Sequence, residues 1–170
     1  MKSLKTLVSL TALTVCMGAA SLANAASISP EGPFTTTAGS IVVQSPSSFG
    51  GSVTCGITFS GTVTGGVATI TNAALTGGGL CGLPTLKSIP APGWVLTASA
   101  GTDGKKGKVA NVGYTIKKTI VIPATDCGIS TIDVDWNPTT HTLTAANQPL
   151  SGGCNIVSLT TTATGLTVNP

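Results

Sequence analysis

The arrangement of the cysteines constrains the fold of this chain more than any other sequence feature. A Cys-Gly-Ile triplet begins at Cys55 and recurs at Cys127, and Cys81 and Cys154 follow the two triplets at nearly the same distance. Such self-similarity indicates one structural unit present twice, over residues of about 40–99 and 109–168. Each unit has the pattern of a β-hairpin, with its turn at Gly65-Gly66 in the first unit and at residues 137–140 in the second.

The first 25 residues have the pattern of a secretory signal peptide. Lys2 and Lys5 precede an apolar stretch, and a small-x-small cleavage site ends at Ala25. We expect cleavage between Ala25 and Ala26, which leaves residues 26–170 as a single secreted, extracellular domain. The apolar stretch is shorter than the roughly 20 residues of a membrane-spanning helix, so no transmembrane anchor is predicted.

Four cysteines remain after cleavage, an even number that suits the oxidising environment of an exported chain. Four cysteines allow three pairings, and the repeat favours Cys55–Cys81 and Cys127–Cys154. Each crosslink of this length stabilises the fold by about 3 kcal/mol. A structural zinc site is not expected, because the C-x₂-C spacing is absent.

The hydrophobic pattern is that of strands, with no convincing helical segment. Apolar residues alternate with threonines from Val53 to Val63, and residues of one parity from Val112 to Ile122 are mostly apolar. Antiparallel strands of this number close into a sandwich or a barrel, so the predicted class is all-β with two disulfide-tied hairpin units. Trp94, Tyr114 and Trp136 are expected in the core. The expected strands span residues 40–43, 52–64, 67–75, 94–99, 109–122, 129–136, 142–145, 156–160 and 165–168.

Charge excludes one class of partner. The chain has eight lysines, no arginine and five acidic residues, and nucleic-acid binding usually requires a dense basic face with arginine and aromatic side chains. A weakly charged surface can lie against an apolar phase cheaply, because few ions must be desolvated. Lys105, Lys106 and Lys108 lie among glycines and are expected in a mobile, soluble loop, rather than on an anionic surface.

No catalytic residue or cofactor site is predicted, so the chain is not expected to be an enzyme. His141 is the one histidine, it has no motif around it, and we expect it to face solvent from a strand. There is no G-x-S-x-G motif, and no free cysteine if both disulfides form. The role of His141 stays open.

The one calcium candidate is the set Asp133, Asp135 and Asn137, which alternation places on one face of a strand. Calcium takes six to eight oxygen ligands, and the glycine and glutamate of a helix-loop-helix calcium site are missing. The favoured interpretation is a solvated polar strand face. No metal is therefore assigned.

Several segments resemble a known family. These are residues 1–13, residues 39–50, and the surroundings of Asn72, Cys81, Cys127 and Cys154. They are similar to the exported, PraB-like protein activators of alkane oxidation from Gram-negative bacteria. The resemblance implies a secreted protein that assists growth on long-chain alkanes, by dispersing hydrocarbon or by bringing the cell surface into contact with it. It carries over no catalytic or binding residue.

Two alternatives remain at the level of sequence. A matrix or fibre subunit of a biofilm could self-associate through exposed strand edges, for which the extended segment 26–34 is suited. Carbohydrate binding would need an exposed Trp94 or Trp136. An alkane oxygenase is the least favoured, because the chain lacks ligands for a redox metal.

Overall fold

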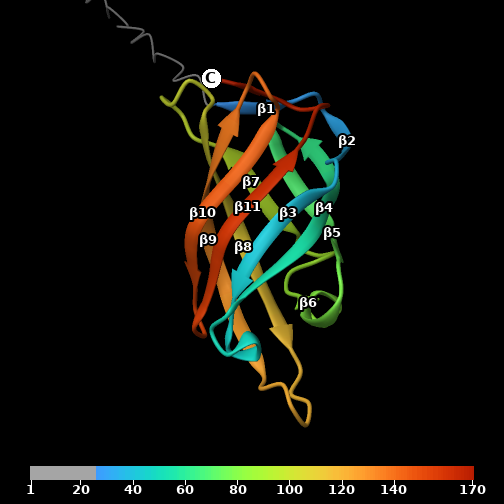
Figure 1. The fold of residues 1–170 in the computed structure, drawn as a ribbon. Helices are drawn as coiled ribbons and strands as arrows, with labels where there is room; N and C mark the ends of the chain where they lie inside the picture. Colours follow the sequence, from blue (N-terminus) through green and yellow to red (C-terminus); the bar gives the residue numbers. More distant parts are fainter. Residues whose placement is uncertain (1–25) are drawn as a thin grey trace, which may run out of the picture.

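The computed structural model describes residues 26–170, which contain twelve strands and two short 3-10 helices. Figure 1 shows them in an elongated body with β1 and the C-terminus at one end, called the upper end. The opposite, lower end carries η1 and the β8–β9 loop. The elements are β1 (Ser27–Ser29), β2 (Gly32–Thr35), β3 (Gly39–Gln44), η1 (Pro46–Ser48), β4 (Ser52–Thr64), β5 (Val67–Thr76), η2 (Gly79–Gly82), β6 (Thr85–Leu86), β7 (Trp94–Ala98), β8 (Lys106–Ile116), β9 (Thr125–Asn137), β10 (Thr142–Leu150), β11 (Cys154–Thr162) and β12 (Thr167–Asn169).

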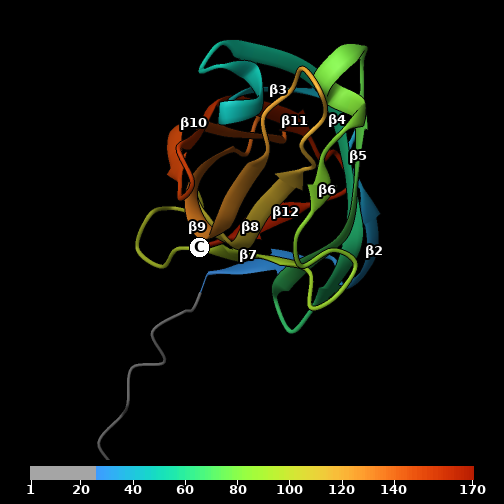
Figure 2. The ribbon, with the colours of Figure 1, turned by 90° about the horizontal axis from the view of Figure 1, so that it is seen from below.

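The main sheet closes on itself as an eight-stranded antiparallel barrel, so the sandwich alternative is wrong. The strands follow the order β4, β3, β11, β10, β9, β8, β7 and β5, and β5 pairs with β4 again. β4 closes the barrel because it is long enough to pair along both of its edges. Its 13 residues pair with β3 and β2 on one side and with β5 on the other. The register of β4 against β5 shifts between Ser60 and Gly61, where β5 has one residue more than β4. Figure 2 looks along the barrel from its lower end.

The core fills the barrel with alternate residues of each strand. Trp94, Tyr114 and Trp136 are buried, as predicted, and the rings of Phe59 and Trp94 lie 6.2 Å apart. At the upper end β1 pairs with β12 and buries Ile28. The segment 26–34 therefore pairs within its own chain, through β1 and through the β2–β4 ladder.

The lower wall has its shortest strand ladders between β5 and β8. β7 pairs with β5 only from Ala68 to Ile70, and the lower half of β5 pairs with β4 alone. Residues 77–93, called the covering segment, lie over this part and include η2 and the two-residue strand β6. The covering segment is attached by the β6–β8 pairing and by hydrogen bonds from Lys87 N to Gly113 O and from Trp94 Nε1 to Lys87 O.

Both disulfides are present, in the pairs that the repeat favours. Cys55–Cys81 joins β4 to η2 in the covering segment, and Cys127–Cys154 joins β9 to the start of β11. β9 and β11 flank β10 in the barrel wall, so the second bond spans three neighbouring strands. The duplication of the two units stays a prediction.

The strand predicted over residues 109–122 is wrong at both ends. β8 begins at Lys106, inside the predicted loop, and ends at Ile116. The apolar parity continues to Ile122, but Lys117 and Lys118 are exposed and the chain turns there. Ile120 consequently lies fully exposed instead of in the core.

Candidate functional site

The most unusual surface feature is the loop between β8 and β9 at the lower end, residues 117–122, here called the tip loop. Its last four residues form a tight turn, with the Thr119 N–H donating to Ile122 O at 2.9 Å and the Ile122 N–H donating to Thr119 Oγ1 at 3.0 Å. The two central positions of the turn are Ile120, fully exposed, and Val121, 75% exposed. Such positions usually hold glycine, asparagine or aspartate. The turn therefore presents two apolar side chains to the outside.

A third exposed apolar side chain at this end is Phe49, which follows η1 and is 80% exposed. Its backbone has a φ of 54°, and η1 is held in place by Ser47. The Ser47 N–H donates to Thr125 Oγ1 at 2.8 Å, and its hydroxyl donates to Pro123 O at 2.7 Å. Since Pro123 directly follows the tip loop, these bonds fix the position of η1 relative to it.

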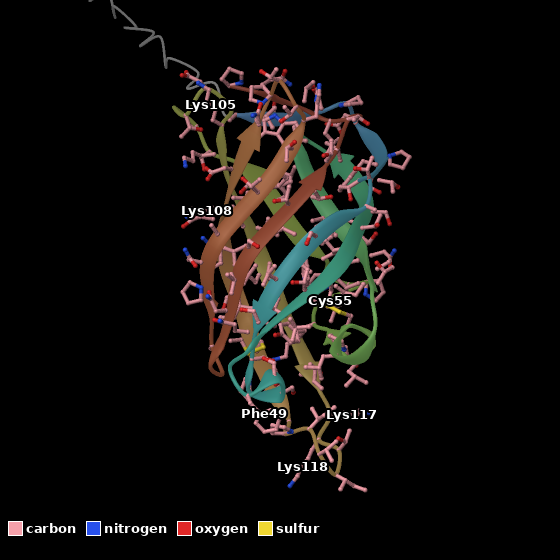
Figure 3. The ribbon with its side chains drawn as sticks, viewed as in Figure 1. Phe49, Cys55, Lys105, Lys108, Lys117 and Lys118 are labelled. Atoms are coloured by element: carbon pink, nitrogen blue, oxygen red, sulfur yellow. A yellow bond between two sulfur atoms is a disulfide. The ribbon has the colours of Figure 1, made fainter. Side chains whose placement is uncertain are left out.

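The charge at the lower end is positive and unbalanced. Within residues 26–170, Lys117 and Lys118 form no ion pair, whereas the other four lysines each lie near an aspartate. Figure 3 shows Phe49, Lys117 and Lys118 together at the lower end, far from Lys105 at the upper end. The lower end thus combines apolar side chains with two lysines.

Behind this end, the barrel encloses an apolar cavity of about 70 Å³. Its lining comes from most of the barrel strands and, in the covering segment, from Leu80, Pro84 and Leu86. Among the described residues that line it, none is charged. Ser45 and Tyr114 provide the hydroxyl groups.

The Tyr114 hydroxyl is buried in this cavity wall without a hydrogen-bond partner in the protein. Burial raises the pKa of Tyr114 above its usual value. Ser45 lies near enough to oppose part of this rise, but the two side chains form no hydrogen bond of normal geometry. The Nε1 of Trp136 also lacks a partner, and Trp136 lies in a separate small hollow near Ile28 and Leu166.

The raised pKa gives a prediction for stability at alkaline pH. The folded state holds the Tyr114 proton more tightly than the unfolded state does. The contribution of this protonation to the free energy of unfolding is therefore constant below about pH 10. It then falls as the pH rises towards the raised pKa, by at most about 1.4 kcal/mol per pH unit. Urea unfolding of wild type and Tyr114→Phe between pH 8 and 11 measures this difference. Tyr114 is the only tyrosine, so tyrosinate absorbance at the ordinary pKa in the folded protein would contradict it.

The calcium candidates are engaged by other groups. Asp133, Asp135 and Asn137 lie on the exposed face of β9, as alternation predicts. However, Lys108 Nζ lies 2.6 Å from Asp133 Oδ1, and Lys106 pairs with Asp135. The Asn137 side-chain oxygen accepts hydrogen bonds from the N–H groups of the following turn. The structure supports a solvated strand face bearing ion pairs.

Two other predicted positions differ in the structure. Lys106 and Lys108 belong to β8, and Lys105 directly precedes it, so the predicted mobile loop is shorter than expected. His141 lies in the turn before β10, not in a strand, with a φ of 52°. Its Nδ1 lies 3.0 Å from Leu166 O and its ring packs edge-on against Trp136, 5.9 Å away. His141 therefore joins the turn to the upper end of the core.

Several sequence predictions have no structural test here. Ala25 and the rest of the predicted signal peptide lie outside the described residues, which begin at Ala26. In residues 26–170 no group of three or more histidine, cysteine, aspartate or glutamate side chains is placed to hold a metal. In that same range no helix has the length and apolar character needed to cross a membrane.

The tip loop is the feature that sequence reasoning missed. Ile120 and Ile122 continue the apolar parity of β8, so the strand predicted over residues 109–122 runs through this loop. Two sequence features mark the end of β8 and the start of the loop. Lys117-Lys118 interrupts the apolar row, and Pro123 follows just beyond the turn.

One comparison with known proteins identifies the family. The family model described as alkane oxidation protein activator, PraA/PraB-like, matches residues 1–170. No curated protein and no solved structure matches the chain. Since the match covers the whole sequence and agrees with the resemblance seen in its segments, the chain belongs to the PraA/PraB-like family of alkane oxidation protein activators.

Proposed function

We propose that this protein is a secreted, non-enzymatic activator of long-chain alkane utilisation that contacts hydrocarbon through the lower end of its barrel. The family supplies the link to alkane oxidation. The observation that carries the contact is the tip loop, in which a hydrogen-bonded turn holds Ile120 and Val121 away from the core.

The physical gain comes from transferring these side chains out of water. Burying one Ile, Val or Phe side chain contributes roughly 1.5 to 3 kcal/mol. Lys117 and Lys118 can keep their ammonium groups in water while their methylene stems follow the apolar surface. The same lysines suit an anionic cell surface, where each contributes about 1 kcal/mol. Contact between droplet and cell is the activity that this end supports.

A secreted and non-catalytic role agrees with the rest of the molecule. Two disulfides suit an oxidising compartment. The aspartates of β9 are paired with lysines and His141 packs against Trp136, so neither group is arranged as an acid or base for catalysis. The family name describes an activator.

Assembly into a biofilm fibre through strand edges has less support. Closure of the barrel gives each of its eight strands a neighbour on both sides, although the lower half of β5 pairs with β4 alone and has the covering segment beside it. Among the described residues, the strands outside the barrel are β1, β2, β6 and β12, which have two to four residues each. Such short edges offer few hydrogen bonds to another chain.

Replacing Ile120 and Val121 together by serine is expected to weaken adsorption to hexadecane on the order of 100-fold, because about 3 kcal/mol of apolar burial is lost. Stability should be unchanged, since neither side chain contacts the core. Adsorption is measured by depletion of protein from water shaken with hexadecane, and stability by urea unfolding.

Ile129→Ser is the matched control, because Ile129 is also exposed but lies on β9 in the barrel wall. It should adsorb like wild type. Equal adsorption of all three proteins would exclude the lower end as the contact. The same proteins, added to a deletion strain growing on hexadecane, test whether adsorption and activation are linked.

A further inference from the structure

The barrel interior contains a polar group that its surroundings do not satisfy. Tyr114 is 8% exposed, lines the cavity, and its hydroxyl has no partner in the protein. Most buried polar groups in proteins are hydrogen-bonded, and an orphaned one is unfavourable. A phenylalanine would avoid this cost, so the hydroxyl at this position requires an explanation.

The chemistry of the lining restricts what could satisfy it. The only other hydroxyl in the described lining is that of Ser45, which forms no hydrogen bond of normal geometry with Tyr114. The remaining lining is apolar, with side chains such as Ile70, Trp94 and Leu143. A carboxylate would be buried there without a cation, since none of the described lining residues is charged. A neutral oxygen on an aliphatic chain can both exchange a hydrogen bond with the phenol and place its carbons against the apolar wall.

We propose that the barrel interior binds the hydroxyl end of an unbranched aliphatic chain, a primary alcohol, with Tyr114 as its hydrogen-bond partner. A primary alcohol is the product formed when the terminal carbon of an alkane gains one oxygen atom, so the ligand class lies one oxidation step from the hydrocarbon. The site is separate from the tip loop, and it does not depend on adsorption there.

Cavity size limits how much of the chain is enclosed. A cavity of about 150 Å³ admits benzene, and the cavity here is about half as large. It therefore encloses the hydroxyl group and only the first few carbons. Affinity should rise with chain length while added methylenes are buried, about fourfold for each, and then level off.

The test uses the secreted protein and three probes of equal length, 1-hexanol, hexane and hexanoate, at pH 7. Binding is followed by calorimetry and by NMR signals of Tyr114 and of Trp94, which lines the cavity. 1-Hexanol is expected to bind about fivefold more tightly than hexane, and hexanoate more weakly than either. Equal binding of 1-hexanol and hexane, or an unchanged Tyr114 signal, would overturn the proposal.

Variants then locate the site. Tyr114→Phe should remove the preference for 1-hexanol over hexane, whereas Trp136→Phe removes the other unpartnered donor and should keep it. Ile120→Ser with Val121→Ser should also keep it, so failure here is distinguishable from failure of hexadecane adsorption. In the series 1-butanol, 1-hexanol and 1-decanol, a gain that continues unchanged to 1-decanol would indicate surface adsorption and overturn the enclosed site.

Discussion

Replacing Cys127 and Cys154 together by alanine is expected to lower the free energy of unfolding by about 3.5 kcal/mol. The bond closes a loop with a sequence separation of 27 residues, and its loss gives that conformational freedom back to the unfolded chain. Both cysteines are buried, at 0% and 4% exposure, so the substitutions also remove packed side-chain atoms from the core. Because domains of this size are typically stable by about 5 to 15 kcal/mol, the loss is a large part of the total.

Removing Cys55 and Cys81 is the matched comparison, because the sequence separation is 26 and the effect on the unfolded chain is nearly the same. The native states differ, however. Cys55–Cys81 holds the covering segment, whose strand pairing is only two residues long, whereas Cys127–Cys154 lies across β9, β10 and β11. We expect the first variant to open locally and the second to lose stability globally.

Hydrogen exchange distinguishes the two outcomes. In Cys55→Ala with Cys81→Ala, amides of residues 77–93 should exchange faster while those of β9 to β11 keep most of their protection. In Cys127→Ala with Cys154→Ala, protection should fall throughout the barrel, and urea midpoints should fall accordingly. Identical exchange patterns in the two variants would refute the distinction.

Replacing Trp94 by alanine is expected to lower the free energy of unfolding by about 3 to 5 kcal/mol, the range for large aromatic side chains in cores. Trp94 is buried against Phe59 and begins β7, the strand that joins β5 to β8 by short ladders. Its Nε1 donates to Lys87 O at 2.8 Å, so it also attaches the covering segment. Loss of the side chain removes core packing and the attachment of the covering segment where the strand ladders are shortest.

Trp94→Phe separates the contribution of ring packing from that of the hydrogen bond, because it keeps much of the packing and removes the bond. Loss of the bond is expected to lower the free energy of unfolding by about 1 kcal/mol. Urea unfolding of both variants can be followed by the fluorescence of Trp136, the other tryptophan of the chain. A loss below about 1 kcal/mol for Trp94→Ala would mean that β7 does not need this side chain to close the barrel.

Local patterns were sufficient to predict the elements that rest on local physics. The span of β4, Ser52–Thr64, follows from strict alternation, and the Gly65-Gly66 turn to β5 follows from two residues that adopt positive φ readily. Barrel closure was not predictable in this way. It depends on pairings such as β3 with β11 and β7 with β5, which join residues far apart in the sequence and leave no local signal.

For the candidate sites too, local patterns predict some residue positions, whereas the contacts depend on packing between distant strands. Parity placed Tyr114 in the core correctly, but the missing partner of its hydroxyl results from packing among many strands. Parity also continued the predicted strand through Ile120, which is exposed in a loop, because periodicity does not show where a strand ends. The pairing of Lys108 with Asp133 required the register of β8 against β9, which the sequence does not display.

Closure of the barrel has a consequence for behaviour in an oil emulsion. Many proteins spread and denature irreversibly on droplets, because their sheets open and neighbouring molecules join into films. Here the long strands already have a neighbour on both sides over most of their length, and two disulfides hold the wall. We expect such a molecule to stay folded when it is released from a consumed droplet. The same molecule can then act on a second droplet.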